Sequence, residues 1–207
     1  MTLNLNNRDC KIGCKLRRPK HKNRIKGLTC VLASALIILG TEAYAGDYVC
    51  KTRLTTIHYS KPDQLKVFAK KIQPGPLTRA INKIFLVRDG KLPTEKLGRD
   101  VDRLFQRVQM ALEMPKPDAR VHIRLYQNQE ELSEVFAKIT GKPTKTPAFY
   151  WKETNTIYVQ TEKISIGILA HEMGHVIIDH YFIIRPPSKI CEMLCQYVDR
   201  QISKDYT

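Results

Sequence analysis

The chain has 207 residues, 43% of them hydrophobic, which is enough for one domain with a sizeable core. The net charge of +15 suggests a nucleic-acid-binding protein at first, but nine basic and only two acidic residues lie within positions 1–45. The other 26 basic and 18 acidic residues leave a diffuse charge of +8 without an arginine-rich stripe. This charge suits a soluble domain near an anionic surface, and we expect neither nucleic acid nor a cell-wall polymer as its partner.

The first 45 residues have the layout of a signal peptide. A basic stretch over 8–26 precedes an apolar run from Leu28 to Leu39, and Ala43-Tyr44-Ala45 then provides the small residues that a signal peptidase requires. We predict cleavage after Ala45, export to the periplasm or the extracellular medium, and no stable membrane insertion afterwards. An uncleaved N-terminal membrane anchor is the alternative, which the short apolar run disfavours.

Cleavage would change the cysteine count. Three cysteines leave with the signal peptide, and Cys50, Cys191 and Cys195 remain. In an oxidising compartment Cys50 could pair with either of the other two, or Cys195 could serve as a small buried hydrophobe. The sequence leaves these alternatives open.

Strand and helix patterns alternate between residues 51 and 141. Asp102 and Arg103 lie off the apolar stripe of the predicted helix over 94–114, so we expect them in solvent. The alternation of the strand over 120–126 turns His122 away from the core, which argues against His122 as a metal ligand. The remaining patterns predict a strand over 51–59 and a helix that begins at Pro62 and is capped by Ser60 or Lys61. Residues 77–88 suit either a helix or a strand. A further helix is predicted over 130–139, with Asn128 as its cap and Gly141 at its end.

Two short strands over 147–151 and 156–160, joined by a turn at 152–155, precede the most apolar helix of the chain. Together the elements predict an α+β fold with a small mixed sheet, one face of which is covered by helices. Residues 46–207 are expected to form a single domain.

The motif His171-Glu172-Met173-Gly174-His175 lies in this apolar helix. Histidines four residues apart project from one face of a helix, one turn apart, so both can bind the same Zn²⁺. Glu172 lies beside such a metal and can take a proton from a water molecule there. Apolar residues on both flanks indicate a buried helix, in which ionisable side chains need partners or a metal.

A catalytic zinc site needs a third protein ligand, and three candidates follow the motif. His180 is five residues after His175 and is rotated about 140° around the helix, away from the metal. Asp179 lies on the correct face but is displaced along the axis. Glu192 is the strongest candidate, because the prolines before Ser188 restart the chain as an antiparallel helix that brings Glu192 back opposite the histidines.

These residues resemble the gluzincin clan of zinc metallopeptidases, the thermolysin-like group. The strands Thr56-Ile57-His58-Tyr59 and Thr156-Ile157-Tyr158-Val159 are similar to those of peptidase-MA-like and minimal gluzincin domains, so the resemblance extends over about residues 52–203. It implies a zincin-like fold with one Zn²⁺ held by His171, His175 and Glu192, and Glu172 as general base. It also implies that an extended peptide or protein substrate adds to an edge strand formed by Thr156, Ile157, Tyr158 and Val159.

Groups around the ligands complete the expected site. Asp179, Gln196 and Asp199 are candidates for orienting the ligands, and Tyr181 and Tyr197 for stabilising the transition state. The alternative to a peptidase is an inactive domain of the same fold that binds zinc or a peptide without turnover. The pattern selects no substrate, cleavage specificity or oligomeric state, and no role for residues 46–92.

Overall fold

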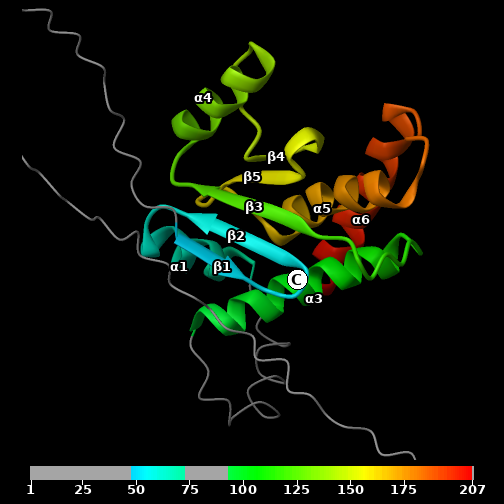
Figure 1. Ribbon diagram of the computed structural model, residues 1–207, viewed down its shortest axis with the longest axis horizontal. Coiled ribbons are helices and arrows are strands. Elements are labelled where there is room, and N and C mark those ends of the chain that lie inside the picture. The colour runs from blue at the N-terminus through cyan, green and yellow to red at the C-terminus, as the bar shows by residue number, and fades with distance from the viewer. Residues whose placement is uncertain (1–47, 73–92, 207) are drawn as a thin grey trace, which may run out of the picture.

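A five-stranded mixed sheet organises residues 48–72 and 93–206, the part of the chain that the computed structural model describes (Figure 1). The α+β fold predicted from the sequence is therefore confirmed. The predicted signal peptide and the ambiguous segment 77–88 lie outside the described residues. The elements are β1 (Tyr48–Lys51), β2 (Thr55–Tyr59), α1 (Pro62–Lys71), α3 (Pro93–Ala111), β3 (Val121–Tyr126), α4 (Gln129–Thr140), β4 (Ala148–Trp151), the 3-10 turn η1 (Lys152–Thr154), β5 (Thr156–Gln160), α5 (Ile166–Tyr181) and α6 (Ser188–Tyr206).

The strands lie in the order β1-β2-β3-β5-β4. The three inner strands are parallel to one another, and β1 and β4 run antiparallel to them at the two edges. In β5, Ile157 lies opposite Ile123 of β3 on one side and Tyr150 of β4 on the other. The expectation that Thr156–Val159 form a substrate-binding edge is therefore wrong, since β5 is paired along both sides and β4 is the edge.

Local signals start and stop the helices as the sequence predicts. The Asn128 side chain accepts a hydrogen bond from the Glu131 N–H at 2.9 Å, and Gly141 ends α4 at a φ of +78°, which favours glycine. At the start of α1, the Gln64 side-chain oxygen accepts from the N–H groups of Ser60 and Lys61. These contacts are short-range, so each could be predicted from a few neighbouring residues.

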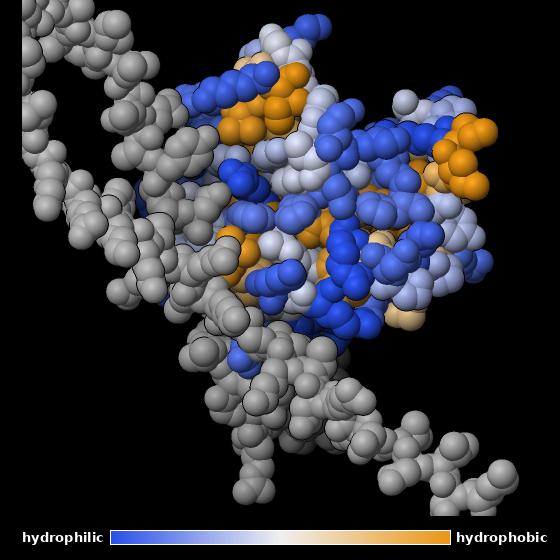
Figure 2. All heavy atoms as spheres, in the orientation of Figure 1, coloured by the Kyte–Doolittle hydropathy of each residue, from blue (hydrophilic) through white to orange (hydrophobic). Residues whose placement is uncertain are grey.

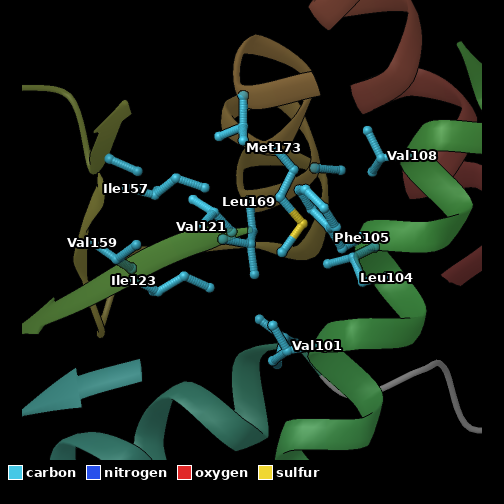
Figure 3. Packing of buried hydrophobic residues seen from close by; sticks show 14 of the residues in the cluster. Val101, Leu104, Phe105, Val108, Val121, Ile123, Ile157, Val159, Leu169 and Met173 are labelled. Atoms are coloured by element: carbon cyan, nitrogen blue, oxygen red, sulfur yellow. The ribbon is translucent and has the colours of Figure 1, made fainter. Parts of the chain in front are cut away.

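The main core lies between the sheet and the helices on one of its faces. Figure 3 shows side chains of α3 and α5 directed toward those of β3 and β5. All of these side chains are buried, and α1 and α6 add to the same cluster. The labelled residues are Val101, Leu104, Phe105 and Val108 of α3, Val121 and Ile123 of β3, Ile157 and Val159 of β5, and Leu169 and Met173 of α5.

The opposite face of the sheet is covered in part by α4. Leu132 is fully buried in a second cluster with Phe149 and Tyr158, and the Phe136 ring meets Phe149 edge-on at 4.8 Å between centroids. The expectation of helices on one face only is therefore wrong. The sequence of α4 indicates which face of the helix is apolar. It does not indicate which face of the sheet that apolar face will cover.

The turn between β1 and β2 departs from two expectations. The predicted strand over 51–59 is divided, because the chain turns at residues 52–54 and pairs with itself as a hairpin. Asp102 of α3, expected in solvent, accepts hydrogen bonds from the Arg53 and Leu54 N–H groups at 3.0 and 3.2 Å. It also accepts from the hydroxyls of Thr52 and Thr55. One carboxylate thus attaches the hairpin to a helix that begins some 40 residues later in the chain.

None of Cys50, Cys191 and Cys195 forms a disulfide, and all three are buried. Among the described residues, no helix has both the length and the apolar character needed to cross a bilayer.

Candidate metal centre

His171 and His175 lie on the face of α5 that α6 covers in part. Ser165 caps this helix by accepting a hydrogen bond from the Ile168 N–H at 3.2 Å. The helix then runs through the core, and the two imidazole rings lie 5.0 Å apart between centroids. The spacing of the motif therefore brings both rings to one place, as expected from the helical repeat.

Two glycines allow α6 to approach α5 closely. A Cβ atom on Gly174 would lie 3.0 Å from the Cys195 sulfur and 3.5 Å from its Cα atom. Gly167, two turns earlier on α5, faces the side chains of Asp199 and Ser203 in the same way. Larger residues at these positions would push α6 outward, so the glycines determine how far Glu192 can reach.

Glu192 places one carboxylate oxygen near each histidine. Its Oε2 atom lies 3.4 Å from His171 Nε2, and its Oε1 atom lies 3.4 Å from His175 Nε2. Hydrogen bonds between charged groups are shorter, about 2.7–2.9 Å. Around a tetrahedral Zn²⁺ with bonds of about 2.0–2.1 Å, ligand atoms are separated by roughly 3.3–3.4 Å. Each of the two distances, which involve different oxygens of Glu192, is thus longer than a charge-assisted hydrogen bond and close to the separation of two ligand atoms on one metal ion.

Cys195 offers a second possible donor set. Its sulfur and one nitrogen of each histidine all lie within 4.8 Å of one another. Burial raises the pKa of the Cys195 thiol, which keeps it protonated, whereas a metal binds the thiolate. Glu192 has an oxygen 3.4 Å from each ring and needs no such deprotonation, so we favour Glu192 as the third ligand and assign Cys195 to the packing of α6 against Gly174.

His175 has the protonation state that a metal ligand needs. Burial lowers its pKa below the usual value of 6.5, although Glu192 opposes this shift, so the ring is neutral at pH 7. Its Nδ1 atom is buried and has no hydrogen-bond partner. One helical turn later, both carboxylate oxygens of Asp179 are also buried without hydrogen bonds, although Oδ1 lies 3.2 Å from Arg185 Nε. Arg185 Nε and Asp179 Oδ1 are close enough for a hydrogen bond, but the N–H group does not point at the oxygen. The Asp179 carboxylate can therefore still accept a hydrogen bond from His175.

Glu172 is buried beside the histidines and is fixed by the edge strand. Its Oε2 atom accepts a hydrogen bond of 2.9 Å from the Tyr150 N–H of β4. Burial raises the pKa of Glu172 from 4.5 to about 7, an effect that the Tyr150 N–H opposes and the Glu192 charge increases. A carboxyl group with a pKa near neutral can both accept and release a proton, as a general base must.

A cleft of about 480 Å³ opens onto these residues, lined by β4, the motif residues of α5, Glu192 and Arg185. In an antiparallel pair, every second residue directs its N–H and C=O groups away from the partner strand. The Tyr150 N–H points to Glu172, so Tyr150 and Ala148, two residues earlier, direct these groups away from β5. Ala148 and Tyr150 thus present main-chain polar groups along the cleft.

Several predicted site residues lie elsewhere. Tyr181 and Tyr197 are exposed, at 45% and 49%, and neither lines the cleft. Gln196 is also exposed, and Asp199 accepts a hydrogen bond from Ser203 at 3.1 Å and faces Gly167, a full turn before His171. His180 donates from Nδ1 to the Val176 carbonyl at 2.9 Å, in agreement with its exclusion as a ligand.

Two contributors to the cleft were not predicted from the sequence. The Tyr150 N–H is a main-chain group, which no side-chain pattern reveals. Arg185 precedes Pro186-Pro187. Because these prolines end the helix, the sequence places Arg185 in the turn between the two helices, and its side chain lines the cleft there.

Comparisons of the chain with models of protein families, with curated proteins and with solved structures found no match.

Proposed function

We propose that the protein is an exported zinc metallopeptidase, with His171, His175 and Glu192 as ligands and Glu172 as general base. The observation that carries the proposal is the position of one carboxylate, 3.4 Å from each of two imidazole nitrogens, beside a buried glutamate that faces a cleft. The gluzincin resemblance of the motif supports the same reading and rests on the sequence alone.

Zinc bound in such a site lowers the pKa of water and polarises a carbonyl group. The residues of this chain supply the rest of the chemistry. Glu172 would accept the proton of the attacking water and deliver it to the leaving amine. The Tyr150 N–H holds the carboxylate in place during both transfers.

The substrate in this proposal is an extended peptide that adds to β4. Main-chain pairing with the N–H and C=O groups of Ala148 would align the peptide along the cleft, past Glu172 and the histidines, while the Tyr150 N–H stays bonded to Glu172. β4 takes the role that the sequence had suggested for Thr156–Val159, because β4 is the edge of the described sheet that lines the cleft beside the proposed ligands.

The test is zinc content together with hydrolysis of a mixed peptide library. We expect one zinc per wild-type chain and peptide cleavage, retained zinc but no cleavage in Glu172→Gln, and loss of zinc in Glu192→Ala. Glu153→Gln removes another carboxylate that lines the cleft and should leave both properties unchanged. Absence of zinc from the wild type would contradict the proposal.

Zinc in the wild type without cleavage of any peptide would support the alternative, a domain that binds zinc or a peptide without turnover. Export is tested separately by N-terminal sequencing of the protein from the producing cells. We expect the mature chain to begin at Gly46, and a start at Met1 would contradict cleavage.

A further inference from the structure

The turn between α5 and α6 exposes large apolar side chains. Ile183 is 104% exposed and Ile184 is 85% exposed. Figure 2 shows a hydrophobic patch at the end of the molecule where Figure 1 draws this turn. Soluble proteins seldom leave such side chains clustered in water unless the surface binds something.

The exposed face of α6 continues this surface. Ile190, Met193 and Tyr197 follow one another at spacings of three and four residues and are each about half exposed. Tyr181 at the end of α5 is exposed to a similar extent. We call these six residues, Tyr181, Ile183, Ile184, Ile190, Met193 and Tyr197, the apolar patch. It includes both tyrosines for which the sequence had suggested a role in catalysis.

Cations share the outer face of α6 with the patch. Lys189, Arg200 and Lys204 are all exposed. At 100° per residue, these three and the apolar residues of α6 project within an arc of about 100°. The outer face of this helix is therefore both apolar and positively charged.

The carboxylates of α6 whose side chains are described turn the other way. Glu192 faces His171 and His175, and Asp199 faces Gly167 and accepts from Ser203. The positive charge on the outer face is thus not balanced by acidic groups of the same helix over residues 188–204.

We propose that the apolar patch and its cations dock the protein onto the surface of a bilayer that contains anionic phospholipids. Isoleucines on a protruding turn can enter the headgroup region without a matching pocket, tyrosines favour that region, and lysine and arginine attract anionic headgroups. The chain after position 45 has more basic than acidic residues, and this positive charge also attracts the protein to an anionic lipid surface.

Charge also argues against a second copy of the chain as the occupant. A two-fold contact would place the patch against itself and bring Lys189 and Arg200 of both copies into the same interface. Like charges brought together in an interface oppose association, whereas an anionic lipid surface neutralises them.

Docking would also affect the candidate metal centre. Glu192 lies on the same helix as the patch, and Arg185, which lines the cleft, directly follows Ile184. The cleft would therefore open close to the bilayer surface and meet polypeptides held there. The docking itself does not depend on the proposed peptidase activity.

The first test is co-sedimentation of the full chain, as its producing cells release it, with vesicles of phosphatidylcholine and phosphatidylglycerol. We expect binding that weakens with salt, that is at least tenfold weaker on phosphatidylcholine alone, and that falls at least tenfold in the double variant Ile183→Ser/Ile184→Ser. Lys189→Gln/Arg200→Gln should weaken binding and reduce its salt dependence. Met110→Ser removes an exposed apolar side chain of α3, outside the patch, and should bind as the wild type does.

All of these variants share the same N-terminal segment, so its contribution cancels. Absence of binding by the wild type, equal binding by the isoleucine variant, or equal binding to neutral vesicles would overturn the proposal. So would a lipid-free dimer that the isoleucine substitutions dissociate, because the occupant would then be a second copy.

A local probe tests the geometry separately. Brominated lipids should quench the fluorescence of the tryptophan introduced by Ile184→Trp. The Met110→Trp variant should show no more quenching than the wild type, in which Trp151 alone is fluorescent. Equal quenching in both variants, or none in either, would place the contact away from the patch and overturn the proposal.

Discussion

Glu192 brings one carboxylate to two imidazoles without forming a hydrogen bond with either. The two imidazoles and the carboxylate are separated by more than a charge-assisted hydrogen bond, and all three have lone pairs that a cation between them would use. Cys195 lies near the same place with a protonated thiol. The choice between these two donors can be tested at single residues.

Cys195→Ser is expected to keep zinc affinity within about threefold of the wild type, because the sulfur serves in packing. Glu192→Gln, which removes the charge and keeps the shape, should weaken zinc binding by at least about 100-fold, more than the loss of an outer hydrogen-bond partner usually costs. Competition with a chromogenic chelator measures both affinities. Loss of zinc in the serine variant with retention in the glutamine variant would make Cys195 the ligand.

In the metal-free protein, Glu172→Gln should raise the free energy of unfolding at pH 8 and leave it nearly unchanged at pH 5. The folded-state pKa of about 7 exceeds the ordinary value of 4.5, so the native state binds the proton more tightly than the unfolded chain does. The wild type therefore loses stability as the pH rises from about 4.5 through 7, by at most about 3 kcal/mol.

Urea denaturation in the presence of a chelator measures this difference. Glu153→Gln, at an exposed position, should show no such pH dependence. An equal effect of Glu172→Gln at both pH values would mean that burial does not perturb this carboxyl group.

At the scale of elements, the candidate metal centre depends on the contact between α5 and α6. α5 supplies two histidines from one face, and α6 supplies Glu192 only because Gly167 and Gly174 leave room for it. The edge strand β4 completes the arrangement through the hydrogen bond from Tyr150 to Glu172.

Gly174→Ala should weaken zinc binding by about tenfold or more, since the added Cβ would meet Cys195 at 3.0 Å and displace α6 together with Glu192. Isothermal titration with zinc measures the effect. Gly98→Ala is the matched control, because its Cβ would meet Thr52 of the β1–β2 turn at 2.5 Å, and neither residue belongs to α5 or α6. It should lower stability and leave zinc affinity unchanged, and equal losses of affinity would show that any packing defect disturbs the site.

At the scale of the molecule, contacts between distant segments join the sheet to its helices. Asp102 is the clearest example, because one side chain accepts hydrogen bonds from four groups of the β1–β2 turn. A partly buried carboxylate with several donors stabilises the contact between the turn and α3, and its removal leaves those donors without their acceptor.

Asp102→Ala should lower the free energy of unfolding by roughly 1–3 kcal/mol, because several donors lose their acceptor. Asp100→Ala, which removes only a surface ion pair with Arg103, should cost less than about 1 kcal/mol. Urea denaturation of both variants with zinc bound measures the difference. Equal losses would mean that the turn is held by something other than Asp102.

The sequence alone determined what local chemistry controls. The 3.6-residue repeat placed His171 and His175 on one face, Asn128 and Gly141 delimited a helix, and the break before Ser188 brought Glu192 back toward the histidines. Each inference needed only neighbouring residues and standard helix geometry, and the structure agrees with all of them.

Only the tertiary structure decided which surfaces meet. It made β4 rather than β5 the edge and gave Asp102 four donors in the β1–β2 turn. It also covered part of the second face of the sheet with α4 and left Tyr181 and Tyr197 on an exposed apolar surface. The physical reason is that a residue pattern shows which face of an element is apolar, but not which distant element will cover that face.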